Sequence, residues 1–317
     1  MGETREATTR TLEELPILHA LPRRSGSARP TVRRACALGV ASLALQLAAG
    51  ASAQAQTDYY NTDRGRPVQI EDAYSTERYA FELKLAPVRV EWADGAPSWG
   101  IEPEIAYGLL PRTHLEIGVP IAFEGADGGS RRAGMAGLEL SLMHNLNAET
   151  RTVPALGLRA DVLLPVGDYA PDRTYTTFTG MLTRTFSSLR IHLNGQYTAG
   201  AEPKIVGSRP VLGPGQVQDR GANVEELSRW LAGMAIDRAL PLRSLLLTAE
   251  LFARQPILEA DDVALVAGAG LRWQASPSVA LDLGFGRRVD ARSGPWYVTF
   301  GSAYAFGLSA LMPGGTR

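Results

Sequence analysis

The feature of this sequence that most restricts its fold is a pair of alternating segments, residues 98–110 and 113–123. In both segments apolar side chains take every second position, and the positions between them carry mainly carboxylates and small residues. Successive side chains of a β-strand point to opposite faces, so each segment is expected to form a strand with one apolar face. The short break at Leu110–Thr113 leaves room for a tight turn. The two segments therefore predict a β-hairpin with one apolar and one polar face.

Such a hairpin fits two kinds of protein. In a soluble β-sandwich the apolar face packs in the core and the acidic face meets water. In a membrane barrel the apolar face meets lipid and the acidic face lines the lumen. Each apolar face covers roughly ten residues, which suits a tilted membrane strand better than the five or six residues of a typical soluble strand. The hairpin alone leaves both interpretations open.

The rest of the chain repeats this alternation in about twelve strand-like segments. Pro87 interrupts the first of them and is expected to mark a β-bulge, because proline cannot donate to the ladder. The eighth also has helical features, but Trp230, Ala232 and Met234 alternate with smaller residues and favour a strand. The expected strands cover residues 77–92, 98–110, 113–123, 134–146, 153–166, 175–186, 189–199, 227–238, 245–254, 263–274, 279–286 and 296–306.

The connections between these segments alternate in length. The short set is 110–112, 145–150, 187–188, 240–243 and 275–278, and the longer set is 124–133, 167–174, 202–223, 255–262 and 289–295. Bacterial barrels have short periplasmic turns and longer external loops, whereas a sandwich has no reason for this regularity. Aromatic residues also gather at strand ends, as in the girdles at the two bilayer interfaces. The sequence therefore predicts an all-β fold, a transmembrane antiparallel up-and-down β-barrel of about 12 strands over residues 77–306, with a secreted soluble β-protein as the alternative.

The first 55 residues have the features of a cleavable signal peptide. Arg33 and Arg34 precede a mostly apolar run, residues 35–50, that ends in small residues matching an A-x-A cleavage site. The run is shorter than the roughly twenty residues of a membrane-spanning helix, although a retained signal anchor is the alternative. A polar lead over residues 56–76 follows, and residues 307–317 form a C-terminal tail. We expect export to the bacterial outer membrane.

Composition excludes two further classes of function. The only cysteine, Cys36, lies within the leader, so the mature chain is expected to contain no disulfide and no cysteine site. Beyond residue 55 the chain has 25 basic and 29 acidic residues, without the basic patch of a nucleic-acid-binding protein. Nucleic acid is therefore not an expected partner.

At the level of motifs, the chain resembles a known group. The segments WGIEPEIAYGLLPRTHLEIGVPIAF and WYVTFGSAYAF are similar to those of the outer-membrane barrels named for the MetA pathway of phenol degradation, and the likeness covers most of residues 74–306. The resemblance implies passage of small, often hydrophobic or aromatic, compounds and brings no catalytic motif. The chain departs from many such barrels by continuing through Gly307–Arg317 after the aromatic Phe306.

The candidate functional residues are charged side chains expected to face the lumen. Acids predominate in the first four strands and arginines in the later ones. Such a lumen can create a field that orients polar solutes, or its charges can pair and fill a narrow interior. The candidates are Glu82, Lys84, Glu102, Glu104, Glu116, Glu139, Arg159, Asp161, Arg190, His192, Glu250, Arg272 and Asp282, with Arg89, Glu91 and Arg254 as further members.

Catalysis is the remaining class to consider. An acyl hydrolase needs a histidine beside a nucleophile and an orienting group, and no serine lies at an obvious cross-strand position from His192. We therefore expect no catalytic residue, cofactor or metal site. The expected function is passive passage of small molecules, with outer-membrane lipid, the solute and the barrel-assembly machinery as partners. A non-conducting structural or adhesive barrel, or an outer-membrane lipid hydrolase, is the alternative.

Overall fold

The structure, a computed structural model, describes residues 61–92, 98–124, 132–171, 173–200, 205–206, 209–210, 227–241, 244–257, 263–290, 294–308 and 311. The expected signal peptide, most of the C-terminal tail and most of the 202–223 connection lie outside these residues. In the described part of the chain, no helix is long and apolar enough to cross a membrane.

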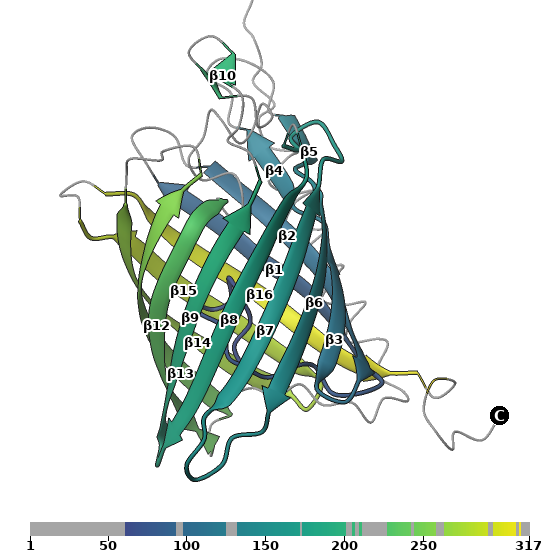
Figure 1. Cartoon of the computed structure of the whole chain (residues 1–317), viewed down its shortest axis with the longest axis vertical. Coiled ribbons are helices and arrows are strands. Elements are labelled where there is room, and N and C mark those ends of the chain that lie inside the picture. Colours follow the sequence, from purple (N-terminus) through teal and green to yellow (C-terminus); the bar gives the residue numbers. More distant parts are fainter. Residues whose placement is uncertain are drawn as a thin grey trace, which may run out of the picture. The chain divides into compact units, whose positions relative to one another are not determined.

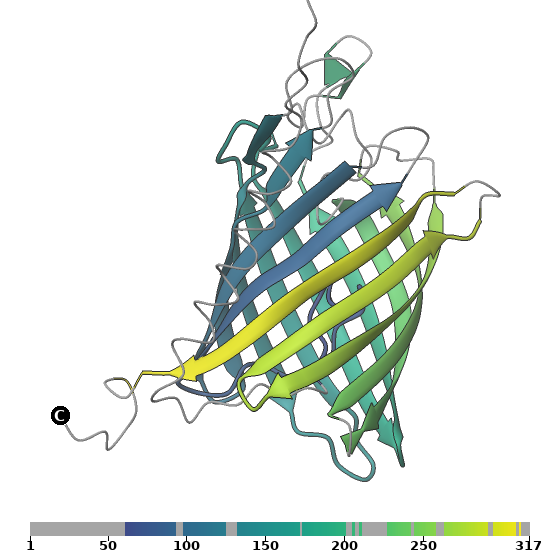
Figure 2. The ribbon, with the colours of Figure 1, turned by 180° about the vertical axis from the view of Figure 1, so that it is seen from behind.

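Fourteen antiparallel strands form one sheet that closes on itself, because β1 pairs with both β2 and β16 (Figures 1 and 2). β3 and β4 both pair with β2, one after the other, while β6 pairs with β3 and β5 pairs with β4. β3 and β4 together therefore form one interrupted strand of the barrel wall, and so do β5 and β6. We call each such continuous or interrupted wall strand a stave. The barrel described here therefore has twelve staves. The strands are β1 Ala80–Trp92, β2 Ser98–Leu110, β3 Thr113–Gly118, β4 Ile121–Glu124, β5 Arg132–Met135, β6 Leu138–Asn147, β7 Ala155–Leu164, β8 Tyr175–Phe186, β9 Leu189–Ala199, β12 Ser228–Leu240, β13 Leu245–Pro256, β14 Ala264–Ser276, β15 Val279–Arg288 and β16 Trp296–Gly307.

A second, two-stranded sheet consists of β10 (Ile205–Val206) and β11 (Arg209–Pro210). It falls within the long connection between β9 and β12, where the sequence predicts a loop.

The apolar side chains face outward and the ionised ones face inward. Leu115 is 42% exposed while its neighbour Glu116 is 4% exposed, and Leu283 is 48% exposed while Asp282 is 5% exposed. A closed sheet satisfies its own backbone hydrogen bonds, and an apolar outer surface suits hydrocarbon. The predicted barrel is confirmed, the soluble sandwich is wrong, and the protein is a bacterial outer-membrane β-barrel.

Turn and loop lengths divide between the two ends of the barrel. The connections after β2, β8 and β14 are two-residue turns at the end where β1 begins and β16 finishes, the lower end in Figure 1. Longer connections lie at the other end, which we call the loop end. With an even number of staves, the short turns mark the periplasmic end, which we call the turn end.

Stacked aromatic pairs mark both ends of the wall. Trp92 stacks on Trp296 with ring centroids 4.0 Å apart near the loop end, and Phe81 stacks on Phe306 at 5.3 Å near the turn end. The predicted bulge in β1 is also confirmed, because the register with β16 shifts between Lys84 and Val88, around Pro87. Arg89 and Glu91 consequently continue the inward face.

Candidate functional site

The lumen contains the N-terminal segment that precedes β1. Residues 61–78, which we call the plug, run through the turn-end half of the barrel before the chain enters the wall (Figures 1 and 2). Arg66, Ile70 and Asp72 are among the most buried side chains of the protein. The segment is polar and contains Gly65 and Pro67, so it has no alternation that would make it a strand.

Wall side chains provide the hydrogen bonds that a neighbouring strand would otherwise supply. One oxygen of Glu250 accepts the N–H groups of Gln69 and Ile70, at 2.8 and 2.9 Å. Asn194 binds Glu71 on both sides, accepting its N–H and donating to its carbonyl, each at 2.8 Å.

Wall side chains also bind the backbone of the plug at Ala73. The Ala73 N–H donates to the Thr183 hydroxyl at 3.0 Å, and the Asn145 amide donates to the Ala73 carbonyl at 2.6 Å. A buried backbone group without a partner costs free energy, and these contacts remove that cost.

Two plug arginines connect opposite sides of the wall. Arg64 donates to Asp161 at 2.8 Å and also contacts Glu139. Arg66 donates to Asp282 at 2.9 Å and lies 3.4 Å from Glu82. These pairs reach β6 and β7 on one side and β15 and β1 on the other.

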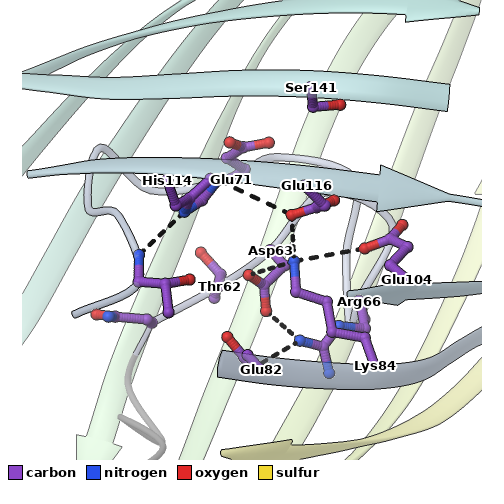
Figure 3. Close-up of polar contacts among 12 residues, drawn as sticks. Thr62, Asp63, Arg66, Glu71, Glu82, Lys84, Glu104, His114, Glu116 and Ser141 are labelled. Carbon is purple, nitrogen blue, oxygen red and sulfur yellow. Dashed lines mark hydrogen bonds and ion pairs between the residues drawn. The ribbon is translucent and has the colours of Figure 1, made fainter. Parts of the chain in front are cut away.

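A mixed-charge cluster surrounds Lys84, as Figure 3 shows. The Lys84 ammonium lies 2.8 Å from Glu116, 3.3 Å from Asp63 of the plug and 3.4 Å from Glu104. Glu116 also pairs with Arg159 at 3.1 Å. The plug is thus inserted into pairs that the wall already makes with itself.

The pKa values of the plug carboxyls follow from their surroundings. Burial raises the pKa of Glu71 to about 7, and Arg159, 3.7 Å away, only partly opposes this. Burial likewise raises the pKa of Asp72 to about 6 against the opposing effect of Arg190. For Asp63 burial acts in the same direction, but Arg66, Lys84 and Arg272 outweigh it and hold the pKa well below its usual range.

His192 lies between two other buried side chains, Thr183 and Asp237. Its Nδ1 lies 2.9 Å from the Thr183 hydroxyl and its Nε2 lies 2.8 Å from Asp237, which also forms a two-pronged pair with Arg190. A hydroxyl, an imidazole and a carboxylate in series are the parts of a nucleophile relay. Here the hydroxyl accepts the N–H of Ala73 and all three side chains are buried, which suits a structural anchor for the plug.

The plug separates two cavities. A cavity of about 440 Å³ on the turn-end side is lined by Asp63, Tyr74, His114 and Arg272, among others. On the loop-end side a cavity of about 30 Å³ is lined by Arg64, Leu231, Phe252 and Arg254, among others. The smaller volume holds about one water molecule.

Glycines on the inner face make room for the plug. A Cβ at Gly284 would lie 1.8 Å from the Pro67 carbonyl oxygen, and one at Gly270 would lie 2.7 Å from the Pro67 Cβ. Glycine at these inward positions of the strands is explained by the close approach of the plug backbone.

All thirteen candidate residues lie on the inner face of the wall. Nine of them contact the plug: Glu82, Lys84, Glu139, Arg159, Asp161, Arg190, Glu250, Arg272 and Asp282. Glu102, Glu104, Glu116 and His192 belong to the wall network. Among the described residues, no group of three or more His, Cys, Asp or Glu is arranged to hold a metal ion.

Sequence reasoning missed several residues of this site. Asp237 lies on the inward face of the predicted eighth strand, and that position was the available signal. Asn145, Thr183 and Asn194 are neutral and had no such mark. The plug itself lies in what the sequence indicated only as a polar lead.

Comparison of the chain with known proteins finds similarity to solved structures only. No family model matches it, and no curated protein matches it by sequence. It is similar to the COG4313 outer membrane channel from Pseudomonas putida F1 (14% identity, TM-score 0.46, 74% of this chain and 98% of that chain). It is also similar to the KdgM porin (10%, 0.44, 72% and 99%) and to outer membrane phospholipase A from Escherichia coli (10%, 0.40, 77% and 98%). Identities this low assign neither an activity nor a solute to this chain.

Proposed function

We propose that this protein is a small-molecule channel of the outer membrane that its own N-terminal segment closes. The observation that carries the proposal is the placement of residues 61–78 between two lumen cavities, held by contacts to the wall. A segment outside the strand order can leave the lumen without breaking any pairing between strands.

The chemistry of the plug supports reversible closure. Its contacts with the wall are mainly hydrogen bonds and ion pairs, which water and ions can replace. The apolar part is small: Ile70 packs in a cluster with Leu231, Ala235, Phe252, Val266 and Tyr297 of the wall. The strands' own side chains fill the interior of a barrel of about eight strands, whereas this wider barrel is closed with the help of an additional segment.

The apolar cluster also bears on the solute. When Ile70 withdraws, the wall presents Leu231, Phe252 and Tyr297 to the passage. Small hydrophobic or aromatic compounds can pack on such side chains, in line with the family that the sequence resembles, and we propose membership of that family. The proposal gives His192 and Thr183 a positioning role for the plug and assigns no enzymatic activity.

The test compares the wild type with a variant lacking residues 61–76 in planar bilayers and in liposome-swelling assays. We expect rare openings from the wild type, and larger, persistent conductance steps with faster swelling from the deletion variant. Heat-modifiable mobility on gels reports that each barrel is folded. A folded deletion variant that neither conducts nor swells liposomes would support a non-conducting structural barrel instead.

A further inference from the structure

We propose that the lumen, once the plug withdraws, holds a binding site for planar organic cations that carry an apolar group. This inference rests on the proposed function and names the solute class that the vacated site selects. It follows from a difference between the wall cations and the wall carboxylates in how many partners each loses when the plug leaves.

The wall cations that contact plug carboxylates keep partners of their own. Lys84 retains Glu116 at 2.8 Å, and Arg159 retains Asp161 at 2.7 Å. The other two pairs are Arg190 with Asp237 at 2.7 Å and Arg272 with Asp282 at 2.6 Å. Withdrawal of Asp63, Glu71 and Asp72 therefore leaves these four cations paired.

Among the wall carboxylates that contact the plug, Glu250 and Glu82 lose most. Glu250 loses the two backbone N–H donors of Gln69 and Ile70. Glu82 loses the guanidinium of Arg66. Asp161 and Asp282 lose Arg64 and Arg66 but keep Arg159 and Arg272 on the wall. Glu139 loses Arg64 and keeps Arg159 at 3.8 Å.

A carboxylate in a confined lumen is costly when it has lost its donors, and a cation restores the balance. Planar amidinium and guanidinium groups match carboxylate geometry with two parallel hydrogen bonds. The side chains of Arg64 and Arg66 carry such a guanidinium group. Around Glu250 and Glu82 the open lumen therefore favours cations over anions.

The apolar requirement comes from the same place in the plug. Ile70 donates its N–H to Glu250, and its side chain packs against Leu231, Phe252 and Tyr297. Removing the plug thus vacates an apolar pocket beside a carboxylate that has lost its two backbone donors and keeps only wall partners, the Tyr297 side chain and the nearby Arg89. An aromatic ring with an amidinium group fills both parts, with the ring in place of the Ile70 side chain and the cation on Glu250.

The test uses three probes of nearly the same shape and different charge: benzamidine (cation), benzamide (neutral) and benzoate (anion). The protein is the full chain with Arg64→Gln and Arg66→Gln, which weakens the plug, and the deletion of residues 61–76 is the second open form. Arg184→Gln is the matched control, because Arg184 binds the carbonyls of Thr150 and Arg151 at the turn end. Binding is read from the shift in thermal unfolding in detergent, and selectivity from the reversal potential in a KCl gradient.

We expect benzamidine alone to raise the unfolding temperature of both open forms and to reduce their K⁺ current, with a cation-selective reversal potential. Adding Glu250→Gln should remove most of the benzamidine effect while conductance persists, and Arg184→Gln should behave as the wild type. Conducting open forms that prefer anions, or that bind benzoate as well as benzamidine, would overturn the cation site and leave the channel standing. Folded open forms that bind benzamidine selectively but never conduct would support the site and overturn the channel.

Discussion

The guanidinium of Arg66 lies 2.9 Å from the carboxylate of Asp282, across a sequence separation of 216 residues. On the wall, Asp282 already accepts a hydrogen bond from Arg272 at 2.6 Å. The plug therefore joins an ion pair that is complete without it. At Asp282 the plug adds a contact and the Arg272 pair remains when the plug leaves, as the proposed reversible closure requires.

Replacing Asp282 with Asn should weaken this closure. The substitution leaves Arg66 and Arg272 facing a neutral amide, and removing one partner of a buried ion pair typically costs about 3–5 kcal/mol. We expect a higher open probability in bilayers and faster proteolysis of the plug. Asp290→Asn is the control, because Asp290 pairs with Arg288 at the exposed loop-end rim. Equal effects of the two substitutions would contradict a specific role for Asp282.

Replacing Gly284 with Ala should displace the plug by sterics alone. The new methyl group would lie 1.8 Å from the Pro67 carbonyl oxygen, so the plug has to move. Overpacking of this kind costs about 1–3 kcal/mol. Gly195→Ala is a matched control, since a Cβ there meets nothing within 4 Å on the lipid-facing side. We expect Gly284→Ala alone to increase conductance, with both barrels still heat-modifiable.

The wall could be predicted from the sequence because its physics is local. Apolar and polar side chains alternate with a period of two along each strand. β8 and β9 begin and end where this alternation does. The plug could not be predicted in this way. Its residues are fixed by partners far along the chain, such as Glu250 for Ile70, and its own sequence has no period. The inward charges were readable one by one, but their pairing depends on the register between strands.

Closure should weaken as the pH rises from about 5 to 8. In the docked plug the pKa of Glu71 is about 7 and that of Asp72 about 6, because burial favours the neutral forms. In a free, solvated segment both carboxyls titrate near 4. The docked state therefore binds more protons between these values, and raising the pH through this range favours withdrawal.

The measurement is the open probability in bilayers buffered at pH 5.5 and pH 8. Charged groups on the packed walls enter the comparison too, chiefly Arg159 near Glu71 and Arg190 near Asp72. Glu71→Gln removes one of the two titrations and should flatten the profile. An open probability that falls with rising pH would show that the wall groups, not the plug carboxyls, set the dependence.

Fixing the plug to the wall should abolish conductance. Ile70 and Ala235 belong to the same buried cluster, and Cys36 in the leader is the only cysteine of the chain, so Ile70→Cys with Ala235→Cys creates one addressable pair. Oxidation or a short bis-maleimide should lock the plug and remove openings, and reductant should restore them only after oxidation. Gly180→Cys with Gly195→Cys is the control pair, because these cross-strand partners lie on the outer face away from the plug. If the locked barrel conducts as well as the reduced one, solute passes by a route that does not require the plug to leave, because the lock acts on the plug and leaves the strand pairing of the wall unchanged.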